Sequence, residues 1–432
     1  MPLVLCVYGL ACALATLISL RPPMKPGAVA LGGFFIGWLV SELPLHHIAL
    51  QLGIGVFLVA TGGLSEWPGW IGLVALMLSL LGLRRHLILA ARTTQAVERG
   101  LQQTLGRDYH DHIDPRLRDT YDPSLNWSWL RLATIFPFRP RHIDCIRHVE
   151  YHREGKVRLR LDVYRGRGTD ELAGPRPVFV YVHGGGWVIG NKAQQGRLTI
   201  HDLAAGGWVC VSVNYRLSPR ATFPDHLMDI KRALAWVKVN IATYGGDPDF
   251  VVIGGGSAGA HLASLAALTA GRPEYQPGFT EVDLSVRGCI AYYGVFDFVD
   301  DEGAFQHRGF RDLLLRRLVM KKRIEDDRAA YERASPVYQV HADAPPFLIV
   351  HGDRDSLAPI AQARRFRDQL AAVSRAHVGW IELPGAQHAF EVFPSLRSVV
   401  AVHGVHRFCQ VLWSVRQRTR QVAPATGATV DR

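Results

Sequence analysis

The stretch Phe250-Val-Val-Ile-Gly-Gly-Gly-Ser257-Ala-Gly-Ala-His-Leu262 decides the fold of this chain. Four apolar residues lead into three glycines, a serine and a run of small residues, which predicts a buried strand, a tight turn and a helix. Gly255-x-Ser257-x-Gly259 fits the G-x-S-x-G pattern, in which a sharp turn between strand and helix exposes a nucleophilic serine. Because the chain has 42 glycines in 432 residues, this pattern needs support from elsewhere in the sequence.

The same glycines also fit a dinucleotide-binding fingerprint, Gly254-x-Gly256-x-x-Gly259. That fingerprint requires an early position in its domain and an acidic residue at the end of the following strand. Here about five predicted strands come first, and the following strand, 288–293, ends at Gly294. The context therefore favours a nucleophilic serine.

Strand-like and helix-like runs alternate on both sides of this stretch, from residue 141 to residue 418. The predicted strands cover 143–151, 157–164, 178–182, 208–214, 250–253, 288–293, 347–350 and 378–383. Such alternation predicts an α/β fold with a mostly parallel central sheet and helices on both of its faces. The charged stretch at about 300–335 interrupts the alternation, and we expect it to form a helical cap.

A second glycine-rich turn, His183-Gly184-Gly185-Gly186-Trp187, directly follows the strand predicted at 178–182. Glycines let backbone N–H groups point at a ligand with no Cβ in the way. Attack of a serine on a carbonyl creates an oxyanion, which N–H donors already aimed at it stabilise. Two such loops in this order indicate acyl-transfer chemistry, and we expect His183 to hold its loop by hydrogen bonds.

Two later strand ends supply the other groups that acyl transfer needs. The segment His351-Gly-Asp353-Arg-Asp355 offers two acids, and His388 follows the last predicted strand. The order serine, acid, histidine is that of hydrolases with a nucleophile elbow. The six cysteines form no Cys-x-x-Cys pair or metal-ligand spacing, so they indicate neither a disulfide framework nor a zinc site. Acyl transfer by a serine, a histidine and an acid needs neither a metal nor an organic cofactor, and we expect none.

The first 83 residues carry only four formal charges, Arg21, Lys25, Glu42 and Glu66, which sum to zero. Apolar runs cover 3–20, 28–43, 46–63 and 69–83. Since soluble helices need a polar face, we expect three or four transmembrane helices. Basic residues follow the first run, whereas a cleaved signal peptide has them in front. The Lys/Arg distribution leaves the side of the catalytic domain open, because three full spans would put the two basic clusters on opposite sides.

The remaining segments complete the expected organisation. Residues 84–140 are expected to contain an amphipathic linker helix, at 84–105, and then an aromatic and proline-rich candidate lid. A catalytic domain is expected over 141–418, and a flexible tail over 419–432. The net charge of +11 lies on residues 84–432, yet no basic run interleaved with aromatics and no helix-turn-helix spacing indicates nucleic-acid binding.

From about residue 142 onward the chain resembles the α/β-hydrolase esterases of the hormone-sensitive-lipase-like group. The resemblance rests on the motifs above together with Asn214-Tyr-Arg-Leu-Ser-Pro219, Phe223-Pro224 and Gly245-Gly-Asp247. It implies an α/β-hydrolase fold and a carboxylic ester hydrolase, an esterase or lipase that works through an acyl-enzyme. The site residues that it implies are the triad Ser257, Asp355 and His388, the oxyanion donors Gly185, Gly186 and Ala258, and the supporting His183 and Gly184.

The apolar region in front of this domain extends the resemblance. The stretch 34–44 is similar to membrane-bound actinobacterial esterases. We therefore expect a multi-pass protein of a bacterial cell membrane that acts in lipid metabolism. Its expected partners are a small-molecule or lipid ester and the membrane lipids. The sequence does not indicate an oligomeric state.

Departures from the group keep alternatives open. Gly256 stands where the group usually has an acid, and the pattern at 256–262 is similar to formamidases and prenylcysteine methylesterases. An amidase, arylformamidase or prenylcysteine methylesterase on the same triad is therefore one alternative. A non-catalytic ligand-binding receptor on a hydrolase fold is another, and loss of a triad residue, its expected mark, is absent from the sequence.

Overall fold

The computed structural model describes residues 1–23, 27–118, 120, 132–167, 174–305 and 308–422. Eight strands of these residues form one sheet in the order β1-β2-β4-β3-β5-β6-β7-β8. The strands are β1 (Ile143–Glu154), β2 (Val157–Gly166), β3 (Arg176–Val182), β4 (Val209–Val213), β5 (Gly246–Gly256), β6 (Gly288–Tyr292), β7 (Phe347–Gly352) and β8 (Val378–Leu383). β1 and β2 pair antiparallel, β2 pairs antiparallel with β4, and all other neighbours are parallel. The predicted, mostly parallel sheet of an α/β-hydrolase fold is confirmed.

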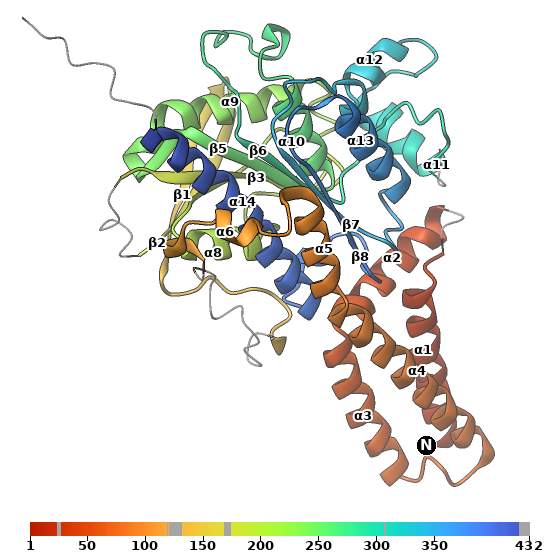
Figure 1. Ribbon diagram of the computed structural model, residues 1–432. Helices are drawn as coiled ribbons and strands as arrows, with labels where there is room; N and C mark the ends of the chain where they lie inside the picture. The colour runs from red at the N-terminus through yellow and green to blue at the C-terminus, as the bar shows by residue number, and fades with distance from the viewer. Residues whose placement is uncertain (24–26, 119, 121–131, 168–173, 306–307, 423–432) are drawn as a thin grey trace, which may run out of the picture.

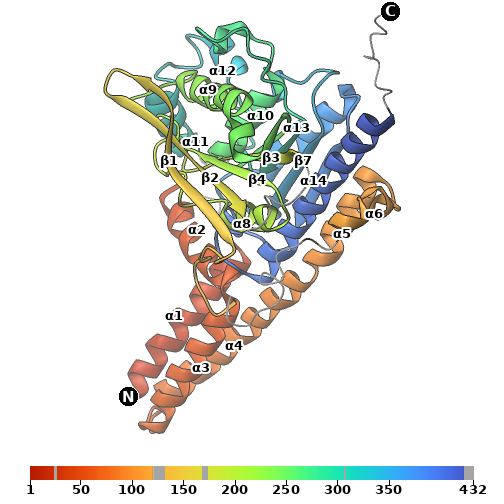
Figure 2. The ribbon, with the colours of Figure 1, turned by 90° about the vertical axis from the view of Figure 1, so that its left-hand side faces the viewer.

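Helices cover both faces of the sheet (Figures 1 and 2). They are α5 (Thr93–Leu105), α8 (Arg197–Ala205), α9 (Asp225–Asn240), α10 (Ala258–Leu268), α13 (Ile360–Val373) and α14 (Leu396–Val422). Side chains of a strand alternate between the two faces, so Val178 and Val180 of β3 pack with α9, α10 and α13. Phe179 and Tyr181 of the same strand pack with α5, α8 and α14. A strand buried on both faces explains the unbroken apolar run from which β3 was predicted.

The helix that was expected as a linker, α5, is part of the α/β domain. Val97 and Leu101 of α5 are fully buried in the core on the side of α14. Glu98 of the same helix pairs with Arg407 of α14 at 2.7 Å. The expected tail from residue 419 also begins as structure, because α14 continues to Val422. Much of the candidate lid, at 119 and 121–131, lies outside the described residues.

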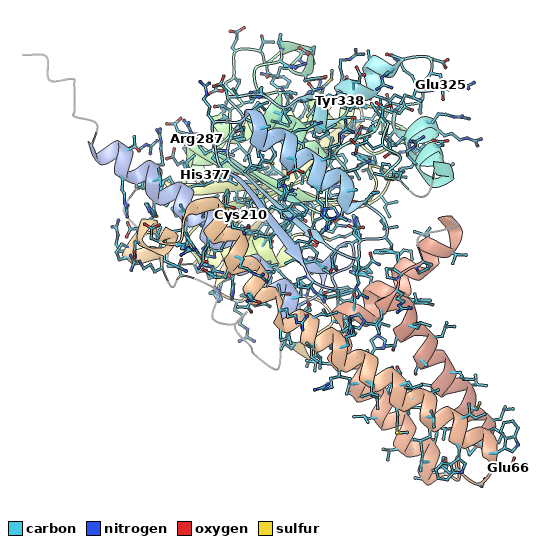
Figure 3. All side chains as sticks on the ribbon, turned by 45° about the vertical axis from the view of Figure 1, so that its right-hand side comes forward. Glu66, Cys210, Arg287, Glu325, Tyr338 and His377 are labelled. Atoms are coloured by element: carbon cyan, nitrogen blue, oxygen red, sulfur yellow. The ribbon has the colours of Figure 1, made fainter. Side chains whose placement is uncertain are left out.

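Each apolar run of the N-terminal region forms a helix: α1 (Pro2–Leu20), α2 (Gly27–Glu42), α3 (Pro44–Ala60) and α4 (Trp67–Ala91). α1, α3 and α4 form a stalk that projects from the α/β domain, with α2 at its base (Figure 1). Glu66 marks the far end of the stalk (Figure 3). Two helical stretches are long and apolar enough to cross a membrane: Pro2–Leu20, which is α1, and Trp67–Leu105, which is α4 together with α5. The pair Leu31–Glu42 and Pro44–Ala60, bent by 89°, raises the number to three if it counts as one span.

The two long stalk helices touch through small and polar residues. A Cβ atom on Gly9 of α1 would lie 2.0 Å from the carbonyl oxygen of Gly72 of α4, so only glycine fits there. Farther along, the hydroxyls of Thr16 and Ser79 lie 2.7 Å apart. Small residues at a close crossing and hydroxyls that bond across it are typical of helices packed within lipid.

A buried ion pair ties the base of the stalk to the α/β domain. Glu42, the last residue of α2, is 1% exposed, and Arg397 of α14 is fully buried. The Arg397 guanidinium donates to the Glu42 carboxylate, which also accepts from the Ser395 hydroxyl at 3.2 Å.

Replacing Glu42 by alanine should therefore destabilise the protein by about 3 kcal/mol, because a buried charge without its partner is costly. Thermal unfolding of the full chain in detergent measures this effect. Glu66→Ala is the matched control at an exposed loop of the stalk, and it should change stability by less than about 0.5 kcal/mol. Equal melting temperatures for the two variants would contradict the prediction.

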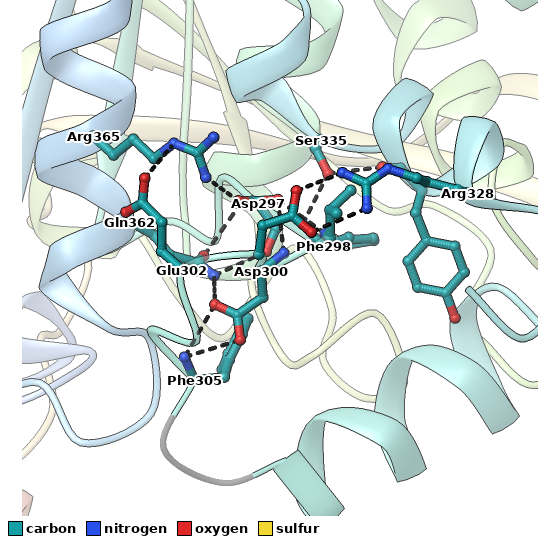
Figure 4. A network of polar contacts seen from close by, with 12 residues as sticks. Asp297, Phe298, Asp300, Glu302, Phe305, Arg328, Ser335, Gln362 and Arg365 are labelled. Atoms are coloured by element: carbon teal, nitrogen blue, oxygen red, sulfur yellow. Dashed lines mark hydrogen bonds and ion pairs between the residues drawn. The ribbon is translucent and has the colours of Figure 1, made fainter. Parts of the chain in front are cut away.

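The insertion between β6 and β7 forms the expected helical elements, α11 (Arg308–Arg311), a π-helix at Asp312–Val319 and α12 (Arg328–Arg333). A polar network fixes the segment that leads into it (Figure 4). The Asp297 carboxylate accepts from Arg365 at 2.7 Å and from the N–H groups of Val299 and Asp300. Asp300 in turn pairs with Arg311 of α11 at 3.3 Å. The segment between β6 and α11 is therefore held in place by Asp297 and Asp300.

Candidate active site

Ser257 stands on the turn between β5 and α10, as the sequence pattern predicts. Its backbone has φ 56° and ψ −121°, a conformation that is costly for a residue with a side chain and recurs at functional sites. The neighbouring glycines permit this turn, since a Cβ on Gly259 would lie 2.0 Å from the carbonyl oxygen of Val182, and one on Gly255 would lie 2.5 Å from it. The Ser257 N–H donates to Tyr292 O at 2.9 Å, which places the serine at the end of β6.

His388 and Asp355 lie on two loops that follow the neighbouring strands β8 and β7. His388 Nδ1 is 2.7 Å from Asp355 Oδ2, and both side chains are buried. The other carboxylate oxygen of Asp355 accepts from the N–H groups of Leu357 at 2.9 Å and Ala358 at 2.8 Å. These two bonds hold the carboxylate in one orientation, in which Oδ2 points toward His388.

A second histidine supports this carboxylate. His351, at the end of β7, places Nε2 3.2 Å from Asp355 Oδ2. Burial alone would raise the pKa of the Asp355 carboxyl, but the charges and hydrogen bonds of His388 and His351 outweigh burial and hold that pKa below its usual range. Asp355 is therefore ionised at neutral pH.

The sequence offers Asp353 as well as Asp355, and the structure separates them. Asp353 Oδ1 accepts from the backbone N–H of Gly385 at 2.7 Å, and this bond joins the loops that follow β7 and β8. Among the described residues, the carboxylate that bonds His388 is Asp355. Asp353 thus holds the loop of the histidine without contacting its ring.

Tyr293 packs between His388 and the turn that carries the serine. Its ring lies 4.6 Å from the His388 ring, edge to face. Its hydroxyl occupies the space beside Gly256, where a Cβ would lie 2.5 Å from that oxygen. The tyrosine hydroxyl therefore leaves no room for a side chain at position 256. No hydrogen bond joins the Ser257 hydroxyl to His388 within the described part of the chain, and such bonds are often long before substrate binds.

A buried carboxylate beneath Tyr293 was missed in the sequence. Glu391 is 1% exposed and accepts from the hydroxyls of Tyr293 and of Tyr181, the latter at 3.0 Å. Burial raises the pKa of the Glu391 carboxyl, and the two hydrogen bonds oppose part of that rise. The signal available in the sequence was an acid in the apolar run 389–393, three residues after His388.

The glycine-rich loop after β3 has the geometry that N–H donors need. Gly185 and Gly186 have φ of 115° and 60°, a region that favours glycine. The N–H groups of Gly185, Gly186 and Ala258 have no protein acceptor among the described residues. Ala258 is the first residue of α10, where the helix dipole adds positive potential. The loop lies close to the serine, since a Cβ on Gly184 would lie 3.1 Å from Ser257 Cβ.

The other two residues of the motif hold this loop in place. The Gly184 N–H donates to the Gln195 side chain at 2.6 Å, so it is already used within the loop. His183 Nδ1 lies 2.8 Å from Gly184 O, and its ring stacks on Tyr215 at 4.5 Å. Burial lowers the pKa of His183 to about 4, so its imidazole is neutral at pH 7.

Apolar side chains border the site on two sides. On one side, Leu314 of the insertion lies 3.6 Å from the position that a Cβ on Gly186 would take. On the other side, the ring of Phe34 from α2 lies 6.1 Å from the His388 ring, edge to face. The sequence assigned α2 to the membrane region and did not predict its contact with the histidine.

A large cavity of the described residues lies elsewhere. It has a volume of about 850 Å³ and is lined by residues that precede β6, β7 and β8, among them Arg287, Pro346 and His377. Figure 3 marks Arg287 and His377 on the α/β domain, away from the stalk. Ligands of open α/β sheets bind at the carboxyl ends of the strands, where Ser257, Asp355 and His388 lie. In the described residues, no group of three or more His, Cys, Asp or Glu side chains could hold a metal ion.

Comparisons with known proteins agree with this architecture. The family model BD-FAE matches residues 161–370. The probable carboxylic ester hydrolase LipM of Mycobacterium tuberculosis is 39% identical, over 97% of this chain and 95% of its own length. Esterase LipQ of the same organism is 38% identical, over 77% of this chain and 78% of its own. The isoprenylcysteine α-carbonyl methylesterase ICME of Arabidopsis thaliana is 32% identical over 50% of each chain.

Solved structures share the fold. A truncated carbohydrate esterase from gut microbiota superposes with a TM-score of 0.54 at 21% identity, covering 66% of this chain and 99% of its own. Esterase B from Lactobacillus rhamnosis also gives 0.54 at 22% identity, covering 69% and 96%. These structures show the fold, and the near full-length match to LipM, with the matches to LipQ and to the BD-FAE family model, shows that the chain belongs to the hormone-sensitive-lipase-like family of carboxylic ester hydrolases.

Proposed function

We propose that this carboxylic ester hydrolase is a serine enzyme with Ser257 as nucleophile, His388 as general base and Asp355 as the acid that orients His388. The observation that carries the proposal is the 2.7 Å bond between His388 Nδ1 and Asp355, on loops next to a serine held at φ 56°. Membership of an enzyme family and retention of all three residues argue against a ligand-binding receptor.

In the acylation step, the roles of the three side chains follow from their bonds. Nδ1–H of His388 donates to Asp355, so Nε2 carries the lone pair that takes the proton of Ser257 as it attacks the ester carbonyl. The ionised Asp355 stabilises the imidazolium that forms. That imidazolium then gives its proton to the leaving alcohol. Water attacks the acyl-enzyme by the same route and releases the acid.

The oxyanion of each step would be held by the N–H groups of Gly185, Gly186 and Ala258. They are supported as donors by the positive φ of the two glycines and by the position of Ala258 at the start of α10. Donors that are already oriented require no rearrangement when negative charge develops, which is why they stabilise the transition state. His183 and Gly184 hold this loop in place through their hydrogen bonds within it.

An activity profile tests the proposed reaction. The full chain should hydrolyse p-nitrophenyl esters, and the matched p-nitroanilides should react at least about 100-fold more slowly, because an amine is a poorer leaving group. Kinetics with acyl chains from acetate to palmitate measure this ratio and the chain-length preference. Faster turnover of the anilides or of a formanilide would favour the amidase alternative. The 32% identity to ICME makes a prenylcysteine methyl ester a useful further substrate.

We also propose that the protein is anchored in a bacterial cell membrane by three crossings, α1, α3 and α4. Support comes from the length of the apolar helices α1 (19 residues) and α4 (25 residues) and from the exposed apolar side chains of the stalk. A helix of 19 residues is about 28 Å long, close to the hydrocarbon thickness of a bilayer. The 89° bend between α2 and α3 leaves α2 along the membrane surface.

This arrangement also favours one orientation. Arg21, at the end of α1, and the exposed Arg84 and Arg85 of α4 lie toward the α/β domain. Two crossings, α3 and α4, separate these clusters, so both fall on the same side. The N-terminus and Glu66 lie at the other end of the stalk (Figure 2 for the N-terminus, Figure 3 for Glu66). Because basic residues accumulate on the cytoplasmic side, the catalytic domain is proposed to face the cytoplasm.

A further inference from the structure

Helix α2 has two apolar faces with different surroundings. On one face, Phe34 is 5% exposed and stacks on the partly buried Trp38, one turn later, at 5.5 Å. On the other face, Phe35 is 52%, Ile36 40% and Leu39 41% exposed. A soluble helix would carry polar residues on such an outer face. The outer face of α2 therefore requires an apolar environment.

The inner face reaches the loop that carries the catalytic histidine. The Phe34 ring contacts the His388 ring edge to face, at 6.1 Å. The Trp38 indole N–H donates to Ala389 O at 3.0 Å, and its ring packs against Phe393 at 4.5 Å. α2 thus holds the segment that directly follows His388, and Phe34 stands beside the imidazole of His388.

The outer face continues the apolar surface of the stalk. Exposed apolar side chains are present on α1, for example Leu14 and Leu17, and on α3, for example Val56 and Phe57. Because α2 turns by 89° into α3, a membrane crossed by α3 would have α2 lying flat at its surface. Helices in that position bury their apolar face about 5–10 Å into the boundary between headgroups and acyl chains. The occupant that fits this face is the bilayer itself.

A neighbouring loop enlarges the same apolar border. Phe136, 58% exposed, packs against Phe393 at 5.7 Å, and Phe393 also contacts Trp38. The loop is tied to the start of α3 by a hydrogen bond between His46 and Ala133 O at 3.1 Å. Aromatic side chains at the junction of a membrane helix and a water-exposed domain are typical of the membrane interface.

We propose that α2 joins the bilayer surface to the catalytic histidine, so that the enzyme takes esters whose acyl chains reside in the membrane. The ester group of such an amphiphile reaches Ser257 along Phe34, while its tail stays on the apolar side of α2. Contact with Phe34 then favours esters with long acyl chains over esters with short ones. The inference rests on the proposed triad and membrane anchoring, and it makes long-chain, membrane-resident acyl esters the substrate class.

The first test compares two substrates on the full chain reconstituted in phosphatidylcholine vesicles. p-Nitrophenyl palmitate partitions into the bilayer, and p-nitrophenyl butyrate stays in water. Phe34→Ala should lower the ratio of kcat/KM for palmitate to that for butyrate about tenfold, as expected when an apolar substrate contact is lost. The conservative Phe34→Leu should restore most of the ratio.

The outcomes separate a substrate contact from mere support of His388. If Phe34→Ala lowers both rates by one factor, the phenylalanine only positions the histidine, and the inference is overturned. An unchanged ratio with unchanged rates would overturn it as well. If the wild-type protein hydrolyses neither ester, the proposed function itself fails, which is a different result from a lost preference.

The second test addresses the outer face. Replacing Phe35 and Leu39 together by glutamine should lower hydrolysis of vesicle-embedded palmitate ester about tenfold and leave butyrate hydrolysis as in the wild type. Val239→Gln is the matched control, since Val239 is 69% exposed at the end of α9 and should affect neither rate. Full palmitate activity in the Phe35/Leu39 variant would show that α2 does not present the membrane to the site.

Discussion

Replacing Ser257 by alanine is expected to reduce ester hydrolysis by a factor of about 10⁴ to 10⁶ without unfolding the protein. The loss is this large because no other group can form the acyl-enzyme, and the oxyanion donors alone give only residual catalysis. His388→Ala should cost about as much, since the serine then lacks its base. Asp355→Asn should cost about 10⁴, because the histidine loses the partner that fixes its tautomer.

Asp353→Asn is the matched control for these variants. It removes a charge two residues from Asp355, but its side chain bonds the Gly385 N–H and does not touch His388. Its activity should stay within about tenfold of the wild type. A fluorophosphonate probe should label the wild-type protein once, at Ser257. Labelling of Ser257→Ala at the same stoichiometry would show that another residue is the nucleophile.

The fold was predictable because each of its elements carries a local signal. β3 and β5 are apolar runs that lead directly into glycine-rich turns, and the residue types in those turns limit what the backbone can do there. Val182 and Gly259 show why the pattern is strict, since any side chain at Gly259 would strike the preceding strand. A local signal of this kind can be recognised from a single sequence.

The environment of the site was not predictable, because it depends on contacts between distant segments. Trp38 bonds Ala389, 351 residues later, and Tyr181 bonds Glu391, 210 residues later. Periodicity describes which face of a helix is apolar and not which partner covers it. For the same reason α5 was expected as a linker, although Val97 and Leu101 lie in the core.

The orientation of the membrane region was left open for a related reason. Four apolar runs look alike in sequence, and counting each as a straight span sets Arg21 and Arg84 on opposite sides. If α2 and α3, bent by 89°, count as a single span, as we propose, one crossing is removed, and hydropathy does not contain this information. The charge distribution then becomes consistent with three crossings.

The second large expected effect concerns the membrane. After treatment with high salt and alkaline carbonate, the full chain should stay entirely in the membrane pellet, because apolar spans are not released when charges are screened. A truncated protein that starts at Arg92 keeps α5 and should be released as a soluble protein, with a lower melting temperature because Arg397 loses Glu42. One that starts at Arg107 lacks Val97 and Leu101, exposes the core against which they pack, and should aggregate.

The orientation can be measured on the same membranes. Glu66→Cys at the end of the stalk should react with a membrane-impermeant maleimide added to intact cells, whereas Val239→Cys on the catalytic domain should react only after the cells are permeabilised. The wild-type chain is the blank, since three of its six cysteines are partly accessible. The opposite labelling pattern would place the catalytic domain outside the cell. Recovery of the full chain in the soluble fraction would overturn the membrane anchor, and with it the role of α2 as the surface that brings an acyl ester to Ser257.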